Sequence, residues 1–282
     1  MEIVTKIAPT CLALIMLGLG MGLTIEDFKN VTKKPRDFLI GIICQMILLP
    51  FIAFILIKIL NTPSELALGV MIIAAAPGGV TSNVLTKFAH GDVALSVSLT
   101  AVVSLISIIS VPLIVFTSAD LLQISNISKD ISMLSISLKM VFVVTIPVIV
   151  GMLIRKFATD FITSKTLIIQ RFSIMLFVIV FAAIWVEEWD RIYSFITRAG
   201  TITLTLNIVM MAVGYYVAKF FATGVAQRRC ISLESGLQNG TLAVFVSSQI
   251  FDDIVYMVPA AAYALSMFVT SIIFVFIIRR NT

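Results

Sequence analysis

The sequence predicts an all-α polytopic membrane protein with about nine transmembrane helices. Of its 282 residues, 60% are hydrophobic and only 12% carry a charge. The mean hydropathy is +1.11, whereas a soluble domain carries roughly 25% charged residues. Apolar runs of about 20 residues recur along the whole chain, and each is long enough to cross the ~30 Å hydrocarbon core as a helix.

The apolar runs give the expected spans in chain order. They are Ile7–Thr24, Phe38–Leu60, Leu66–Phe88, Val93–Thr117, Ile131–Ile154, Ile168–Val186, Thr201–Phe221, Cys230–Ile250 and Ile254–Ile278. The first run differs from a secretory signal peptide, because Glu2 interrupts the basic leader and no small-residue cleavage site precedes Glu26 and Asp27. Since the polar connectors are short, we expect a single transmembrane domain over residues 1–282.

The placement of lysine and arginine predicts the orientation in the membrane. With the N-terminus outside and the C-terminus in the cytoplasm, most of the 20 basic residues fall in inner loops, as cytoplasmic loops favour Lys and Arg. The outer side then holds five basic residues, Lys6, Lys58, Lys129, Arg191 and Arg198, together with the acidic residues Glu65, Glu187, Glu188, Asp190, Asp252 and Asp253. We expect the inner membrane of a bacterium. No nucleic-acid partner is expected, because no basic stripe is interleaved with aromatic residues.

Residues for metal-dependent or nucleophilic catalysis are sparse. Cys11, Cys44 and Cys230 belong to three different spans and form no CxxC or Cys/His arrangement. His90, the single histidine of the sequence, falls in an inner loop. A zinc cluster or a Ser-His-Asp triad would therefore lack its parts, and we do not expect an enzyme.

Two of the spans are interrupted by helix-breaking and polar residues. In the third, Pro77–Gly79 follows a continuous apolar run and precedes the polar residues Thr81–Asn83. In the eighth, the interruption runs from Ser232 to Gly240 and contains the carboxylate of Glu234. Proline removes a backbone donor, and glycine lowers the cost of leaving helical geometry. A single kink is common, but irregular backbone at membrane depth needs surrounding protein or a water-filled cavity.

The two broken spans hold matching positions in two inverted halves. Each is the middle member of a triplet of spans, and the expected orientation makes the triplets run in opposite directions. Such a pair indicates a substrate and ion site near the membrane midplane of a secondary transporter. We expect repeat one over about residues 7–117 and repeat two over about residues 131–278.

The motifs at the breaks resemble those of the bile acid:sodium symporter family. They are APGGVTSN, followed by GDVALSVSLT, and ESGLQNGTLA; the early MGLTIEDF and KKPR are also similar to that family. The resemblance runs from about Leu17 to Phe276. It implies the nine-span form of the fold, in which a core domain with the two crossed, broken helices packs against a smaller panel domain.

The resemblance also implies two sodium ions behind the crossing. The first site would comprise Ser82, Asn83, Ser96, Thr100 and Glu234. The second would comprise Gln45, Glu234, Gln238 and the carbonyls of Ser235 and Leu237. These groups supply only oxygen, which suits a hard cation. Ser96 and Thr100 lie four residues apart and share one helix face, and a carboxylate inside a span is a functional candidate by default.

The substrate implied by the resemblance is an organic anion, bile-salt-like or a small carboxylate such as pantoate. It would bind at the crossing and face the panel, near Gly79, Val80, Asn239 and Gly240. Val80 replaces a hydroxyl residue of some relatives, which counts against a small polar substrate. Free N–H groups at the half-helix starts could hold the anion without a buried Arg or Lys. Lys139 in the fifth span is expected to snorkel toward the outer surface.

Our leading hypothesis is therefore sodium-coupled symport of an organic anion, in which core and panel alternate access to the two sides. The alternative is a proton-coupled or sodium-independent carrier or efflux protein of the same fold, with Glu234 as the proton site. Sodium-independent uptake would favour the alternative. The expected partners are the organic anion, sodium ions and the lipid bilayer, and we expect a monomer.

Overall fold

Helices make up the regular structure of the described residues. The computed structural model describes residues 2–124, 131–187 and 189–280. Within these ranges, seven spans are long and apolar enough to cross a membrane in one piece. They are α1 (Glu2–Gly22), α3–η1–α4 (Pro35–Ile42, Ile43–Leu48, Leu49–Ile59), α7 (Val93–Leu121), α8–η2–α9 (Met133–Met140, Val141–Thr145, Ile146–Phe157), α10 (Thr159–Glu187), α11 (Trp189–Phe221) and η3–α14 (Ile254–Met257, Val258–Arg280).

Two further spans each consist of two short helices. They are α5 with α6 (Ser64–Ala75, Val80–Phe88) and α12 with α13 (Val225–Gly236, Gly240–Ile250). Together with the seven long spans they confirm the nine predicted ones. The second break is shorter than expected: α12 stays helical through Ser232 and Glu234 to Gly236, and Leu237 is the first extended residue, with φ −103° and ψ 106°. One glycine costs a helix only about 1 kcal/mol, so Gly236 does not interrupt it by itself.

Two long helices begin earlier than their apolar runs. α10 begins at Thr159 and not at Ile168, and α11 begins at Trp189 and not at Thr201. Hydropathy marks only the part of a helix that contacts lipid, whereas polar residues with ordinary helix propensity continue the helix beyond it. The expected outer connector between these spans is therefore mostly helical.

The connector between the first two spans also contains a helix, α2 (Ile25–Lys33). It begins with a capping interaction, in which the backbone N–H and the hydroxyl of Thr24 each donate to the Asp27 carboxylate at 2.7 Å. Such an interaction satisfies backbone groups that the first turn leaves open. α2 packs against α7 and so covers the start of that span.

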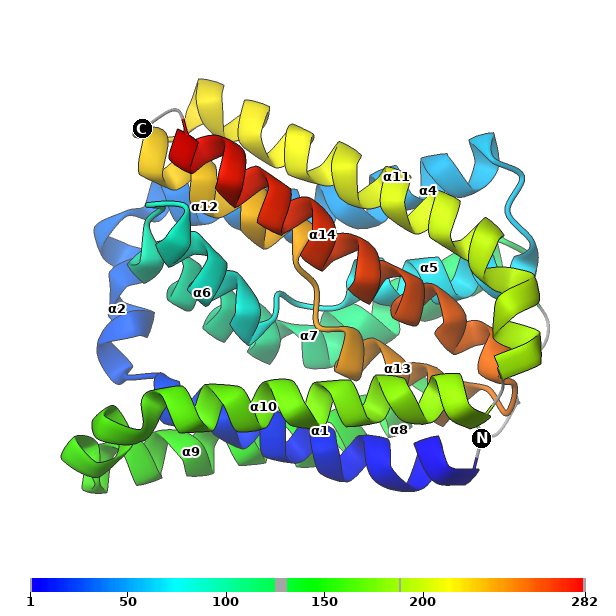
Figure 1. Ribbon diagram of the computed structural model, residues 1–282, viewed down its shortest axis with the longest axis horizontal. Helices are drawn as coiled ribbons and strands as arrows, with labels where there is room; N and C mark the ends of the chain where they lie inside the picture. Colours follow the sequence, from blue (N-terminus) through cyan, green and yellow to red (C-terminus); the bar gives the residue numbers. More distant parts are fainter. Residues whose placement is uncertain (1, 125–130, 188, 281–282) are drawn as a thin grey trace.

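The spans form two layers. In Figure 1, α1, α8, α9 and α10 lie side by side in one layer, which we call the panel layer. α1 packs against both α9 and α10 within it. The remaining spans, including both broken ones, form the thicker core layer. α1 and α10 contact α13 across the boundary, so the panel layer faces the broken spans.

The charged residues distinguish the two ends of the molecule. The end on the left of Figure 1 carries the C-terminal ends of α9 and α14, the start of α12 and the helix α2. Its basic residues include Lys33, Lys34, Lys87, Arg155, Arg228, Arg229 and Arg279. We call it the basic end. The opposite, far end carries Glu65, Asp252 and Asp253. Lys129 and Glu188, which we expected in outer loops, lie outside the described residues.

A proline follows a π-helical turn in the second and fifth spans. η1 lies just before Pro50 and η2 just before Pro147. Proline lacks an N–H, and its ring displaces the carbonyl one turn earlier. The N–H of Leu49 accordingly donates to the Cys44 carbonyl, five residues back. π-Turns often occur at functional sites, and η1 contains Gln45, one of the expected sodium ligands.

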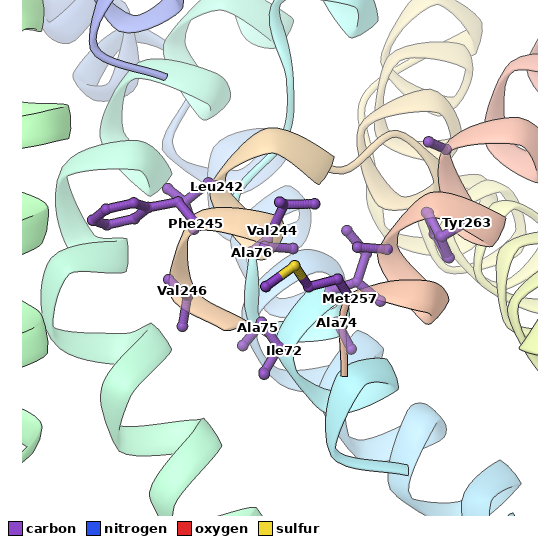
Figure 2. Close-up of a cluster of buried hydrophobic side chains, with 14 of the residues drawn as sticks. Ile72, Ala74, Ala75, Ala76, Leu242, Val244, Phe245, Val246, Met257 and Tyr263 are labelled. Atoms are coloured by element: carbon purple, nitrogen blue, oxygen red, sulfur yellow. The ribbon is translucent and has the colours of Figure 1, made fainter. Parts of the chain in front are cut away.

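A cluster of buried apolar side chains fills the core layer on the far side of the two breaks. Figure 2 shows side chains from α5, α13, η3 and α14 in contact there, among them Ile72, Leu242, Val244, Met257 and Tyr263. Each of these five is fully buried. In a bilayer such packing holds helices together mainly by van der Waals contact, so α5 and α13 are fixed against each other beyond the breaks.

Candidate functional site at the helix crossing

The two breaks cross and are hydrogen-bonded to each other. Gly78 and Gln238 form an isolated antiparallel bridge, and the N–H of Asn239 donates to the Pro77 carbonyl at 2.8 Å. α5 and α12 end at this crossing, and α6 and α13 begin there. Because a helix is partly positive at its N-terminus and partly negative at its C-terminus, the crossing offers places for ions of both signs.

Gly78 permits the close approach of three polar groups. A Cβ atom at this position would lie 2.8 Å from Nε2 of Gln45, 2.8 Å from Oε2 of Glu234 and 3.6 Å from the carbonyl oxygen of Leu237. The two shorter distances are below any ordinary carbon contact, so a larger residue at position 78 would displace the side-chain ends of Gln45 and Glu234. The second, third and eighth spans therefore meet around one point.

The carboxylate of Glu234 is buried among hydroxyl groups. The residue is 1% exposed. Ser82 donates to Oε1 at 2.6 Å, Ser96 donates to the same oxygen, and Oγ1 of Thr100 lies 3.3 Å from Oε2. None of these donors carries a charge, and in the described ranges no Lys, Arg or His side chain pairs with Glu234. Its position in the last turn of α12, at the negative end of a helix, makes an unpaired carboxylate still less favourable.

Asn83 completes the first expected set of oxygen donors. Its Oδ1 accepts a hydrogen bond from the Ser96 hydroxyl at 2.8 Å, next to the carboxylate. The structure thus brings together all five residues expected around the first ion, namely Ser82, Asn83, Ser96, Thr100 and Glu234. Two come from α6, two from α7 and one from α12, so a bound cation would join three helices.

The second expected set lies at the C-terminal end of α12. Nε2 of Gln45 and Nε2 of Gln238 donate to the Glu234 carbonyl at 3.3 and 3.4 Å, and Gln238 also reaches the Ser235 carbonyl at 3.2 Å. The Oε1 atoms of both glutamines are buried and have no hydrogen-bond partner. Because an unsatisfied buried oxygen costs about 1–3 kcal/mol, these two atoms call for a cation or another donor. Amide, carboxylate and carbonyl oxygens together suit a hard cation.

Two cavities extend from the crossing between the core and panel layers. The first, of about 100 Å³, is lined by the first turns of α6 and α13 and by α1, α10 and α14. All four expected substrate contacts line it: Gly79, Val80, Asn239 and Gly240. The second, of about 530 Å³, lies between α1, α6, α7 and α10 and reaches Lys87 near the basic end. The cavities share the lining residues Val80, Val84 and Gln170, so they are adjacent, one at the crossing and the other nearer the basic end.

A separate cavity lies at the far end. It measures about 360 Å³, is lined by Glu65, Ile131 and residues 248–253, and shares no lining residue with the other two. Beside it, Nζ of Lys139 on α8 donates to Oε1 of Gln249 on α13 at 2.9 Å. This hydrogen bond joins the panel and core layers near the far surface, the direction in which Lys139 was expected to reach.

Sequence comparison identifies the protein family independently of the geometry of the site. The model of the Sodium Bile acid symporter family matches residues 9–195, which is more than half of the chain. The chain belongs to the sodium bile acid symporter family. The expected family membership is thus confirmed. The family consists of sodium-dependent transporters, which also confirms the expectation that the chain is not an enzyme.

The chain is also similar to individual curated relatives, over more of its length than the region matched by the family model. The "Uncharacterized sodium-dependent transporter YocS" of Bacillus subtilis is 28% identical over 254 residues, 90% of this chain and 77% of the relative. The "Probable sodium/metabolite cotransporter BASS1, chloroplastic" of Arabidopsis thaliana is 27% identical over 89% of this chain and 61% of its own length. The "Hepatic sodium/bile acid cotransporter" of Rattus norvegicus is 27% identical over 81% of this chain and 63% of its own.

The sequence analysis missed several polar residues that face the crossing of this family member. Asn207 and Tyr263 both donate to the Gly236 carbonyl at the end of α12, and Gln170 and Ser173 line the first cavity from α10. Asn207 is an amide within an apolar run, so the rule that singled out Glu234 could have found it. The sequence carries no comparable signal for Tyr263.

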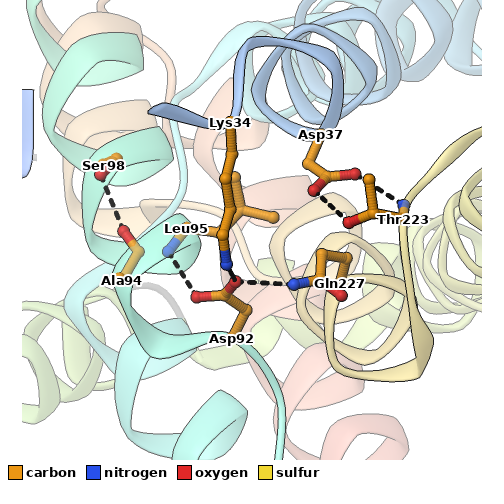
Figure 3. Close-up of polar contacts among 8 residues, drawn as sticks. All are labelled: Lys34, Asp37, Asp92, Ala94, Leu95, Ser98, Thr223 and Gln227. Atoms are coloured by element: carbon orange, nitrogen blue, oxygen red, sulfur yellow. Dashed lines mark hydrogen bonds and ion pairs between the residues drawn. The ribbon is translucent and has the colours of Figure 1, made fainter. Parts of the chain in front are cut away.

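A second carboxylate network lies at the basic end (Figure 3). Asp92, with a side chain 10% exposed, accepts from Nζ of Lys34 at 2.7 Å, from Nε2 of Gln227 at 2.8 Å and from the N–H of Leu95 at 3.1 Å. Burial raises the pKa of Asp92, but these three hydrogen bonds outweigh it and hold the pKa below its ordinary value. The hydrogen bond to Asp92 in turn raises the pKa of Lys34. This network ties α2, α7 and α12 together.

Proposed function

We propose that this chain is a sodium-coupled symporter of an organic anion. The observation that carries the proposal is the Glu234 carboxylate, which is buried at the C-terminal end of α12 with neutral donors. Beside it, the Oε1 atoms of Gln45 and Gln238 have no donor. A cation supplied from outside the chain would satisfy all three groups at once.

Two sodium ions fit the two sets of oxygens. The first ion would bind to Ser82, Asn83, Ser96, Thr100 and one oxygen of Glu234. The second would bind to Gln45, Gln238, the other oxygen of Glu234 and the carbonyls of Ser235 and Leu237. Since both ions share one carboxylate, binding of either would favour the other by holding α12 against its neighbours.

The anion would bind on the opposite side of the crossing. The starts of α6 and α13 are both there, and backbone N–H groups at a helix N-terminus favour negative charge. The lining of the first cavity is mostly apolar apart from Thr81, Gln170, Ser173 and the residues of the second break. This combination favours an amphipathic organic anion, bile-salt-like or a smaller carboxylate. Because Ser82 and Asn83 lie in the first turn of α6, sodium would also set the position of the anion's donors.

Transport would proceed by alternating access. The two adjacent cavities extend from the crossing toward Lys87 near the basic end, while the apolar cluster and the Lys139–Gln249 hydrogen bond lie between the crossing and the far end. With the basic end in the cytoplasm, this arrangement is inward-facing. Movement of the panel layer, with α1 and α10, against the core layer would close this side and open the other.

We propose that the protein lies in a bacterial inner membrane, with its N-terminus outside and its C-terminus in the cytoplasm. It would act as a monomer. Its single transporter domain would contain two repeats, over about residues 7–117 and 131–278.

The test is uptake of candidate anions into proteoliposomes under an imposed sodium gradient. Radiolabelled taurocholate and pantoate serve as the two probes, and the control is the same gradient formed from potassium. We expect accumulation of one of them only with inward-directed sodium. Equal accumulation with both cations would contradict sodium coupling.

A proton-coupled carrier remains the main alternative, since a buried carboxylate also binds protons. Protonation of Glu234 would remove its charge but would leave the Oε1 atoms of Gln45 and Gln238 without a donor. Uptake that follows an imposed pH gradient and ignores sodium would establish the alternative.

A further inference from the structure

Two buried side chains hold one carbonyl at the end of α12. Nδ2 of Asn207, on α11, donates to the Gly236 carbonyl at 2.7 Å, and the hydroxyl of Tyr263, on α14, donates to the same oxygen at 3.0 Å. Asn207 and Tyr263 are both 0% exposed. Gly236 is the last residue of α12, and carbonyls in a last turn have no partner within the helix. Here one of them receives two donors.

The amide of Asn207 is itself fixed in orientation. Its Oδ1 accepts a hydrogen bond from the Thr270 hydroxyl on α14, so Nδ2 must point toward α12. Gly236 lies directly against Met211 of α11, and any Cβ atom there would overlap the methionine side chain. The end of α12 is therefore clamped between α11 and α14.

The direction of the Gly236 carbonyl determines that of the next one. Leu237 is extended, and successive peptide groups of an extended chain point to opposite sides. With the Gly236 carbonyl turned toward α11 and α14, the Leu237 carbonyl turns toward Gly78. The Leu237 carbonyl oxygen lies 3.6 Å from the position that a Cβ atom at Gly78 would occupy. Nε2 of Gln45 and Oε2 of Glu234 each lie 2.8 Å from the same position.

We infer that Asn207 and Tyr263 are positioning residues of the second sodium site. They touch neither the ion nor the anion, but they hold the Gly236 carbonyl away from the site and so direct the Leu237 carbonyl into it. The inference rests on the proposed sodium coupling and adds to it two residues from spans that supply no ligand. It also gives a reason for two costly polar groups within apolar helices.

The test is a sodium titration of the melting temperature of the purified protein at constant ionic strength, with potassium as the replacement cation. Tyr263→Phe removes one donor and keeps the ring, and Asn207→Leu removes the other. Thr270 keeps an acceptor in the second variant, because it also donates to the carbonyl of Ser266. Tyr256→Phe is the matched control, a buried tyrosine at the far end.

We expect Tyr263→Phe and Asn207→Leu each to raise the half-saturating sodium concentration about fivefold, as for the loss of one neutral hydrogen bond, and Tyr256→Phe to leave it unchanged. When Gln238→Ala is added to either variant, the half-saturating sodium concentration should rise by less than the product of the two single changes, because both substitutions act on one ion. Combination with Ser96→Ala should give the full product.

Wild-type half-saturation in both variants, or a shift equal to that of Tyr256→Phe, would overturn the inference. The inference would also be overturned if adding Gln238→Ala raised the half-saturating sodium concentration by the full product of the single changes. That result would indicate that the variants destabilise the fold in general and do not act on the same ion. If Tyr263→Phe does not fold, Asn207→Leu decides alone. A wild-type protein that sodium does not stabilise would instead overturn the proposed function.

Discussion

Two carboxylates, Glu234 at the crossing and Asp92 at the basic end, are both largely buried but have opposite surroundings. Asp92 is paired with the ammonium group of Lys34 and accepts two further hydrogen bonds. Glu234 is surrounded by the hydroxyls of Ser82, Ser96 and Thr100. Asp92 has a cationic partner within the chain, whereas among the described residues no positively charged side chain pairs with Glu234.

Their positions on helices add to this difference. Asp92 is the N-cap of α7, where the helix dipole favours a negative charge. Asp37, a third buried carboxylate, is in the first turn of α3 and accepts from the N–H and hydroxyl of Thr223 at 2.8 and 2.6 Å. Glu234 is in the last turn of α12, where the dipole opposes it. The comparison indicates that Asp37 and Asp92 stabilise the fold through contacts within the chain, whereas the surroundings of Glu234 support the proposal that it binds a mobile cation.

The largest expected effect follows from replacing Glu234. Glu234→Gln keeps the shape of the side chain but removes the only negative charge proposed for two cations, a loss well beyond the ~1.4 kcal/mol that corresponds to a tenfold change. Sodium-driven uptake into proteoliposomes should fall to background. A carboxylate that is only structural would instead give a poorly folded protein with the sodium curve intact. A well-folded variant with wild-type sodium dependence would reject both ion sites.

Replacing Gln45 tests the unsatisfied amide oxygens. Gln45→Leu removes one proposed ligand of the second ion, and we expect the half-saturating sodium concentration of uptake to rise about tenfold, as for the loss of a charge-assisted contact. In potassium, the melting temperature should change little, because the variant removes both a buried oxygen without a donor and a long hydrogen bond of 3.3 Å to the Glu234 carbonyl. A folded Gln45→Leu protein with a wild-type sodium curve would exclude this residue as a ligand.

A smaller effect is expected for one hydroxyl of the first set. Ser96→Ala removes a neutral ligand and should raise the half-saturating sodium concentration about fivefold, with the maximal uptake rate retained. The matched control is Ser98→Ala on the same helix, because Ser98 is 1% exposed and its hydroxyl donates to the Asp27 carbonyl, away from the site. Equal shifts in the two variants would show that the hydroxyl of Ser96 has no specific role.

The smallest effect on transport is expected at Asp92. Asp92→Asn should lower the melting temperature at pH 7 by a few degrees, corresponding to about 1–3 kcal/mol, and leave the sodium curve unchanged. Because the folded-state pKa of Asp92 is lowered, its stabilisation is present above the ordinary carboxyl pKa of ~3.9 and is lost as the pH falls through the folded value. The difference between wild type and variant, measured by thermal melts from pH 7 to pH 3, should therefore shrink at the acid end. A changed sodium affinity would remove the contrast with Glu234.

The sequence was sufficient to predict the spans and the two breaks. Long apolar runs mark helices that must satisfy their backbone within lipid, and Pro77 with Gly78 and Gly79 marks the one place in the third span where the helix cannot continue. The ligand sets depended on the family motifs, because spacing alone does not reveal that Gln45 approaches Glu234 from another span.

Other features depend on tertiary contacts and could not be predicted. The carbonyl of Gly236, at the end of α12, accepts hydrogen bonds from Asn207 and Tyr263, which are distant from it in the chain. The π-turn that contains Gln45 follows from Pro50, a signal present in the sequence whose effect on side-chain direction requires the structure. The polar first turns of α10 and α11 precede the apolar runs from which hydropathy predicts these helices.

The central claim is that a sodium ion completes the Glu234 network. The most direct test is the melting temperature of the purified wild-type protein in sodium and in potassium at equal ionic strength, with Glu234→Gln measured in parallel. Binding to the folded state stabilises it by RT ln(1 + [L]/Kd), so wild type should melt at a higher temperature in sodium, by an amount that grows with concentration, and Glu234→Gln should melt equally in both salts. Equal melting of the wild-type protein in sodium and potassium at every concentration would contradict the account.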